Sequence, residues 1–126
     1  MAGERCDPDT VYWLNKCLPN AMINDTWWQT ETSWPICANL LNTKANGPVF
    51  PTLAGSVTKP MPGYDLKIFN ENNEECKTNE LGKVVIKLPM PPAFMIGLWG
   101  SDEAFIEKYL TETPGYYTSG DAGIMD

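Results

Sequence analysis

Hydrogen-bonding and ionisable side chains directly follow two adjacent tryptophans in the stretch INDTWWQTET, which runs from Ile23 to Thr32. In an extended segment the rings of Trp27 and Trp28 would point to opposite sides, so one can fill a core while the other lines a cavity. Hydroxyl and carboxylate oxygens just after a buried strand lie where an α/β sheet binds its ligand, and such oxygens suit Mg²⁺ and phosphate. The residue types fit equally two core tryptophans followed by a polar surface turn, so both interpretations stay open at this point.

A second candidate site is the sequence TSGD, in which small residues lead into Asp121. Such a sequence is typical of a tight turn. A carboxylate on a turn can also accept two hydrogen bonds from a vicinal diol, which is a common way to hold ribose. The sequence therefore favours either an ordinary turn or a ribose-binding carboxylate at Asp121.

The composition excludes several other kinds of site and partner. No histidine occurs among the 126 residues, which excludes a Ser-His-Asp triad and a Cys2His2 zinc site. With 9 basic and 16 acidic residues the net charge is −7, which argues against nucleic acid and against an anionic membrane as partners. No apolar run approaches the roughly 20 residues that span a bilayer. We expect the four widely spaced cysteines to be reduced and packed as small apolar residues.

Patterns along the chain predict the elements that position these residues. Capping residues and apolar spacing predict a helix over 7–18, with Asp7 as N-cap, and a second helix over 101–110, with Ser101 as N-cap. Alternating apolar residues predict an antiparallel hairpin of strands over 64–70 and 82–88.

Other segments have weaker patterns. We expect a short buried strand over 21–25, a proline- and glycine-rich connecting loop over 36–62, and an aromatic C-terminal strand that turns at Ser119 and Gly120. The chain also stops inside this strand-like segment, so we expect it to be part of a longer protein. Together the elements predict a mixed α/β fold.

Several segments taken in order resemble the adenylate-forming enzymes, and within them the short-chain AMP-forming acyl-CoA synthetases. These segments are AGER, NDTWWQTET, GSVTKPMPGYDLKIFNENNEE, LGKVVIKLPMPP and YYTSGDAGIMD. DTWWQTE resembles the acetyl- and propionyl-CoA synthetase branch, and VVIKLPMPP and PGYY look more like the propionate type. The resemblance implies an internal fragment of a ligase that activates propionate or acetate with ATP, through an acyl-adenylate, and transfers the acyl group to CoA.

The resemblance also implies a fold and a set of small-molecule partners. Residues 1–53 would form the end of a large α/β subdomain, and residues 54–126 a small antiparallel β-rich subdomain truncated at its C-terminus. ATP, Mg²⁺ and CoA would join the short-chain carboxylate as substrates or ions. The mitochondrial matrix or the cytoplasm would be the compartment.

Roles for individual residues follow from the same resemblance. The implied ATP- or AMP-binding residues are Gly3, Glu4, Arg5, Asp25, Thr26, Trp27, Trp28, Gln29, Thr30 and Asp121, with Asp121 at the ribose. Thr30 and Glu31 would be catalytic, with Thr30 near the α-phosphate and Glu31 associated with Mg²⁺. Trp28 would close the acyl pocket and exclude longer acids, while Trp27 faces the core. After TET, Ser33 and Trp34 depart from the glycine or other small residue usual in the family.

Two further expectations concern activity. The phosphate loop should lie upstream of Met1, and the mobile domain with the catalytic lysine downstream of Asp126, so we expect no synthetase activity from the isolated chain. The alternative is a non-catalytic carbohydrate-binding or interaction module, in which Trp27, Trp28 and Trp34 stack on sugar rings.

Overall fold

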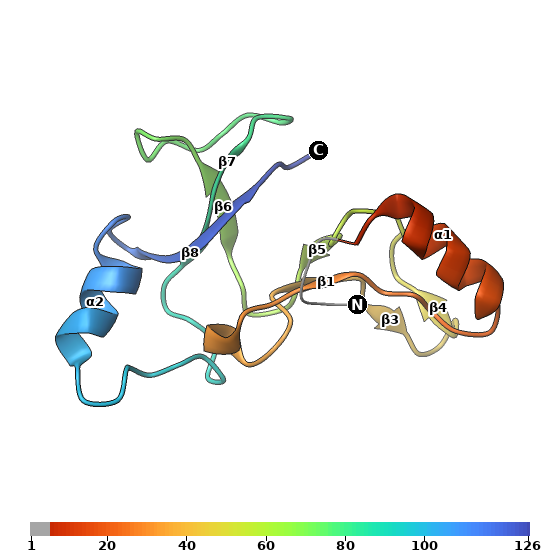
Figure 1. Cartoon of the computed structure of the whole chain (residues 1–126), viewed down its shortest axis with the longest axis horizontal. Helices are drawn as coiled ribbons and strands as arrows, with labels where there is room; N and C mark the ends of the chain where they lie inside the picture. Colours follow the sequence, from red (N-terminus) through yellow and green to blue (C-terminus); the bar gives the residue numbers. More distant parts are fainter. Residues whose placement is uncertain (1–5) are drawn as a thin grey trace. The chain divides into compact units, whose positions relative to one another are not determined.

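The computed structural model describes residues 6–126, so the predicted nucleotide-binding residues Gly3, Glu4 and Arg5 lie outside the described residues. The chain forms two compact units, Met1–Pro62 and Gly63–Asp126. Helices and small antiparallel sheets confirm the predicted mixed α/β fold (Figure 1). Among the described residues no helix is long and apolar enough to cross a membrane. The assignment of 1–53 and 54–126 to two subdomains of a larger enzyme stays a prediction.

Helix α1, Pro8–Cys17, begins at the predicted cap. The Asp7 carboxylate accepts a hydrogen bond from the Thr10 backbone N–H at 3.0 Å, and the Thr10 hydroxyl also donates to it. These bonds favour the ionised carboxylate and lower the pKa of Asp7. Val11 is buried, whereas Tyr12 and Trp13 are exposed, so α1 packs through a narrow apolar face.

The first unit contains very short strands. They are β1 (Thr26–Trp27), β2 (Cys37–Ala38), β3 (Leu41–Asn42), β4 (Gly47–Pro48) and β5 (Lys59–Pro60). Strand β2 pairs antiparallel with β1 on one side and β5 on the other, and β3 pairs with β4 in a separate hairpin. The predicted strand over 21–25 is wrong, because strand pairing begins only at Thr26, and Ala21 and Met22 are exposed.

The second unit is built on a three-stranded antiparallel sheet. Strands β6 (Leu66–Phe69), β7 (Gly82–Lys87) and β8 (Tyr116–Gly123) lie in that order, which confirms the predicted hairpin. Strand β6 can approach the start of β7 closely because residue 82 is a glycine, which has no Cβ atom. A Cβ atom there would lie 2.5 Å from the Phe69 carbonyl oxygen and 2.6 Å from the Cys76 sulfur.

Helix α2, Asp102–Leu110, covers part of this sheet beside β8 (Figure 1). Its N-cap Ser101 accepts a hydrogen bond from the Ala104 N–H at 3.2 Å, as predicted. The Tyr109 ring stacks on the Tyr117 ring with centroids 5.5 Å apart, and both residues are buried. Ile106 is 52% exposed, because packing against β8 is centred on Tyr109.

The cysteines are free thiols in two different environments. Cys6, Cys37 and Cys76 are buried, as predicted. Cys17 is exposed, so the prediction of a packed thiol is wrong there. It is the last residue of α1, in a stretch from Asn15 to Asn20 that is exposed throughout.

Candidate functional site

The two tryptophans lie at the end of β1, where the chain leaves the small sheet. Trp27 pairs with Cys37, and its carbonyl oxygen accepts a hydrogen bond from the Ile36 N–H at 2.8 Å. Trp27 is half-buried, and the expectation that its ring faces the core stays a prediction. The short strand β1 offers little surface to pack over it. Trp28, the implied acyl-pocket residue, is 43% exposed.

A turn of 3-10 helix, η1 (Thr30–Thr32), follows the tryptophans and is organised by the Thr32 hydroxyl. This hydroxyl is completely buried. It accepts a hydrogen bond from the Gln29 N–H at 3.1 Å and lies 2.9 Å from the Gln29 carbonyl oxygen, to which it can donate. Thr32 is a positioning residue that the functional assignment from sequence missed, although the Gln29-to-Thr32 spacing of three residues is typical of a helix-capping turn.

The predicted catalytic pair lies on this turn. Thr30 is exposed and Glu31 is half-buried, so a hydroxyl and a carboxylate are offered from adjacent positions. Asp25 lies just before β1 and is buried. Burial raises the pKa of the Cys6 thiol, and the Asp25 carboxylate raises that pKa further. The segment Asp25–Glu31 therefore brings together acidic and hydroxyl groups with one exposed indole.

Ser33, where the sequence departs from the resemblance, ends η1 in a left-handed conformation with φ 56°. Glycine adopts this conformation most readily, because a Cβ atom clashes with the neighbouring backbone. The backbone of this turn is thus suited to the glycine or small residue that the resemblance predicted. Trp34, next in the chain, is 59% exposed.

Asp121 lies in the second unit, on a bulge of strand β8. Lys83 pairs with Ala122 and Val85 with Thr118, so one residue of β7 faces three residues of β8. The Ser119 hydroxyl donates to the Val84 carbonyl oxygen at 2.6 Å and accepts from the Asp121 N–H at 3.1 Å. The predicted turn at Ser119 and Gly120 is wrong, because the strand continues through the bulge to Gly123. The bulge leaves Asp121 exposed.

Two asparagines, Asn24 and Asn39, bind backbone groups that are distant in the sequence. Asn24 donates to the Asn39 carbonyl oxygen at 2.8 Å and accepts from the Asn39 N–H at 3.1 Å. The Asn39 side chain, only 3% exposed, donates to the Phe50 carbonyl oxygen at 2.8 Å and accepts from the Phe50 N–H at 3.1 Å. The sequence analysis missed both residues, because their partners are 11 or 15 positions away and leave no local pattern.

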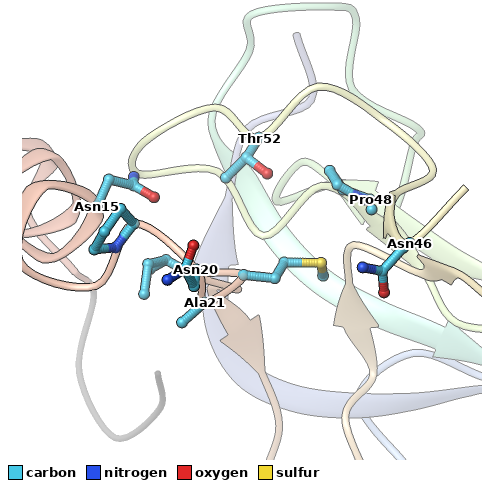
Figure 2. Close-up of a pocket in the computed structure, with 10 residues that line it drawn as sticks. Asn15, Asn20, Ala21, Asn46, Pro48 and Thr52 are labelled. Carbon is cyan, nitrogen blue, oxygen red and sulfur yellow. The ribbon is translucent and has the colours of Figure 1, made fainter.

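A pocket of about 530 Å³ lies in the first unit near these asparagines. Figure 2 shows Asn15, Asn20 and Ala21 on one side of it and Asn46, Pro48 and Thr52 on the other. The polar groups among these labelled residues are amides and one hydroxyl, and none carries a charge. The pocket lining contains none of the predicted nucleotide-binding residues.

Comparison with known sequences gives the context for these features. A sequence model described as AMP-binding enzyme matches residues 1–99. The chain belongs to the AMP-binding enzyme family. This match covers the Asp25–Glu31 segment, whereas Asp121 lies beyond the matched residues.

Individual relatives align with the whole of this chain. The short-chain acyl-CoA synthetase family member 3, mitochondrial, of Mus musculus is 43% identical over 129 residues, covering 100% of this chain and 18% of the relative. The propionate–CoA ligase of Escherichia coli is 38% identical over 129 residues, covering 100% of this chain and 20% of the relative. The chain thus spans about a fifth of the length of these curated relatives.

Proposed function

We propose that the chain forms part of an ATP-dependent acid–thiol ligase that joins propionate or acetate to CoA. The observation that carries the proposal is the Asp25–Glu31 segment, in which an exposed indole precedes a hydroxyl and a carboxylate on one fixed turn. Support comes from full-length alignment of the chain with a propionate–CoA ligase at 38% identity. The propionate type is favoured over the acetate type by the same relative.

The proposed chemistry proceeds in two balanced steps. A carboxylate oxygen attacks the α-phosphorus of ATP, forming an acyl–phosphate bond and releasing pyrophosphate. The sulfur of CoA then attacks the acyl carbon, forming the thioester and releasing AMP, while the thiol proton passes to solvent. Positioning and charge neutralisation provide most of the catalysis in such phosphoryl chemistry, so no histidine is needed from this chain.

Each site residue has a defined part in the proposal. Gly3, Glu4 and Arg5 contact the adenine, the segment from Asp25 to Thr30 contacts the nucleotide, and the Asp121 carboxylate accepts hydrogen bonds from the ribose hydroxyls. The Thr30 hydroxyl donates to the α-phosphate. Trp28 closes the acyl pocket, and its rigid ring limits the length of the acid.

Mg²⁺ fits this arrangement as an ion held jointly with the nucleotide. Among the described residues no group of three or more acidic, histidine or cysteine side chains could hold a metal ion. Mg²⁺ is commonly bound by one or two carboxylates together with substrate phosphates, and Glu31 supplies one carboxylate. When bound, the ion would neutralise phosphate charge, and Glu31 would hold it.

A hybrid enzyme tests the proposal. The matching segment of the Escherichia coli propionate–CoA ligase is replaced by this chain, and propionate-dependent release of AMP and pyrophosphate is measured. We expect activity in the hybrid, and we expect Thr30→Val and Asp121→Asn each to lower kcat/KM by about 10²-fold, because each removes a contact to the nucleotide. Thr43→Val, in the exposed turn between β3 and β4, is the matched control. An active hybrid that is indifferent to both substitutions would contradict the assigned roles.

The 126-residue chain alone should be inactive. Formation of propionyl-CoA from ATP, propionate and CoA by the purified chain would contradict this expectation. Titration with oligosaccharides, followed by tryptophan fluorescence, tests the alternative sugar-binding module, since Trp28 and Trp34 are exposed enough to stack on sugar rings. The ligase proposal predicts no response.

The compartment is also a proposal. We favour the mitochondrial matrix over the cytoplasm because the relative from Mus musculus carries the word mitochondrial in its name. Fractionation of cells that express the gene at its native locus checks this.

A further inference from the structure

We propose that Asn24 and Asn39 act together as positioning residues for the nucleotide-contacting segment Asp25–Thr32. The inference rests on the proposed function for the role of that segment, and on the hydrogen bonds of the first unit for the rest. Asn24 is the residue immediately before the segment. Asn39 is the residue immediately after strand β2, and β2 pairs with strand β1 of the segment.

Asn24 extends the pairing of the short sheet through its side chain. Its side-chain amide makes both a donor and an acceptor bond to the backbone of Asn39, at 2.8 and 3.1 Å. This is the pairing that a neighbouring strand residue would make with its own backbone. Next to it, Thr26 pairs with Ala38 and Trp27 with Cys37, so the side-chain bonds extend the pairing to Asn39, the residue after β2.

Asn39 makes the same pair of side-chain bonds to the backbone of Phe50. Its side-chain amide binds both backbone groups of Phe50, at 2.8 and 3.1 Å, and lies 3.4 Å from the Thr52 hydroxyl. Asn39 is only 3% exposed, so an unpaired amide there would destabilise the folded chain. The position of Asn39 is therefore determined by the loop at Phe50.

The strands of this sheet are too short to hold the segment without the asparagine bonds. Strands β1 and β2 contain two residues each, too few to fix an orientation by backbone bonds alone. With the amide bonds added, the segment is held at Asn24 before the strand, at Trp27 through the Ile36 N–H, and at Thr32 through the buried hydroxyl. Thr30 and Glu31 lie between the attachments at Trp27 and Thr32, and the asparagine bonds hold the end of the chain that leads into them.

Hydrogen exchange in the 126-residue chain tests this directly. In Asn24→Ala and Asn39→Ala we expect the Ile36 N–H, which bonds the Trp27 carbonyl, and the Thr32 N–H, which bonds the Gln29 carbonyl, to exchange about tenfold faster. The Leu18 N–H of the α1 end should be unchanged. Asn42→Ala is the matched control, because Asn42 also binds backbone N–H groups, those of Lys44 and Ala45, but in an exposed turn.

Two results would overturn the inference. One is exchange at Ile36 and Thr32 no faster than in Asn42→Ala. The other is acceleration that is equal at Leu18, which would indicate general loss of structure rather than positioning.

The hybrid ligase gives a second readout that separates positioning from folding. A displaced segment should raise the KM for ATP about tenfold, whereas a smaller folded fraction would lower the apparent kcat and leave KM unchanged. An unchanged KM in both variants contradicts the inference. An inactive hybrid without substitutions contradicts the proposed function instead, and the exchange measurement then decides whether the asparagines fix the segment.

Discussion

At the scale of single residues, Ser33 shows a conflict between side chain and backbone. A left-handed φ of 56° costs about 1–2 kcal/mol for a residue with a Cβ atom, and glycine avoids that cost while losing about 0.5–1 kcal/mol in chain entropy. We expect Ser33→Gly to raise the free energy of unfolding of the first unit by about 0.5 kcal/mol, measured by urea denaturation followed by tryptophan fluorescence. Ser33→Ala keeps the Cβ atom and should give no gain. Destabilisation by glycine would show that the serine side chain is needed.

Cys37 should make the stability of the first unit depend on alkaline pH. Burial raises the pKa of its thiol from 9.0 to about 12. Because the folded state disfavours the thiolate, the stabilising effect is complete below about pH 9 and is lost as the pH rises toward 12. The free energy of unfolding should therefore fall by about 1 kcal/mol per pH unit in this range from this group alone.

The comparison of Cys37→Ala with Cys17→Ala isolates that effect, measured by urea denaturation at several pH values. Alanine at position 37 cannot ionise, so the variant should have a flatter pH dependence above pH 9. Cys17 is exposed, and its replacement should leave the slope of the parent chain. Equal slopes in the two variants would contradict the assigned cause.

At the scale of elements, the bulge of β8 depends on one hydroxyl. Ser119→Ala removes the donor to the Val84 carbonyl and the acceptor for the Asp121 N–H. We expect the free energy of unfolding of the second unit to fall by about 1–2 kcal/mol, and the Asp121 N–H to exchange faster with solvent. Ser119→Thr keeps the hydroxyl and should retain most of the stability. A loss of similar size in both variants would implicate side-chain volume rather than hydrogen bonding.

The elements predicted correctly from the sequence are those with local signals. Asp7 and Ser101 are capping residues placed directly before helical patterns, and alternation of apolar residues gave β6 and β7. The strand expected over 21–25 was wrong because the side chain of Asn24, not its backbone, makes the bonds to Asn39. The sequence Ser-Gly-Asp predicted a turn instead of a bulge because small and polar residues are typical of both.

At the scale of the whole molecule, exposed apolar side chains are numerous. In the second unit Ile96 and Trp99 are essentially fully exposed, at 98% and 104% of the reference area, and in the first unit Tyr12 and Trp13 are about 60% exposed. We expect the purified chain to bind a dye that reports exposed apolar surface. Trp99→Ser should lower the dye signal measurably, whereas Phe94→Ser, at a residue that contacts Tyr117, should raise it by loosening the core. A sharp melt with no dye binding would contradict this expectation.

The site could be predicted from sequence only in part. The resemblance named the segment around Trp28 and Thr30, and the family match covers that segment. It did not show how two-residue strands could hold the segment, because that depends on Asn39 and Phe50, which are far apart in sequence. Nor did it show that a buried hydroxyl at Thr32 organises the turn.

The bulge that presents Asp121 has a second consequence, for association between molecules. Strand β8 is an edge of its three-stranded sheet, and a straight edge strand offers unpaired backbone groups to the edge of another chain. Where one residue of β7 faces three of β8, the edge is bent and its backbone spacing no longer matches a regular strand. The same two extra residues that carry the Asp121 carboxylate out of the sheet thus also make this edge less suited to pairing with the edge of another chain.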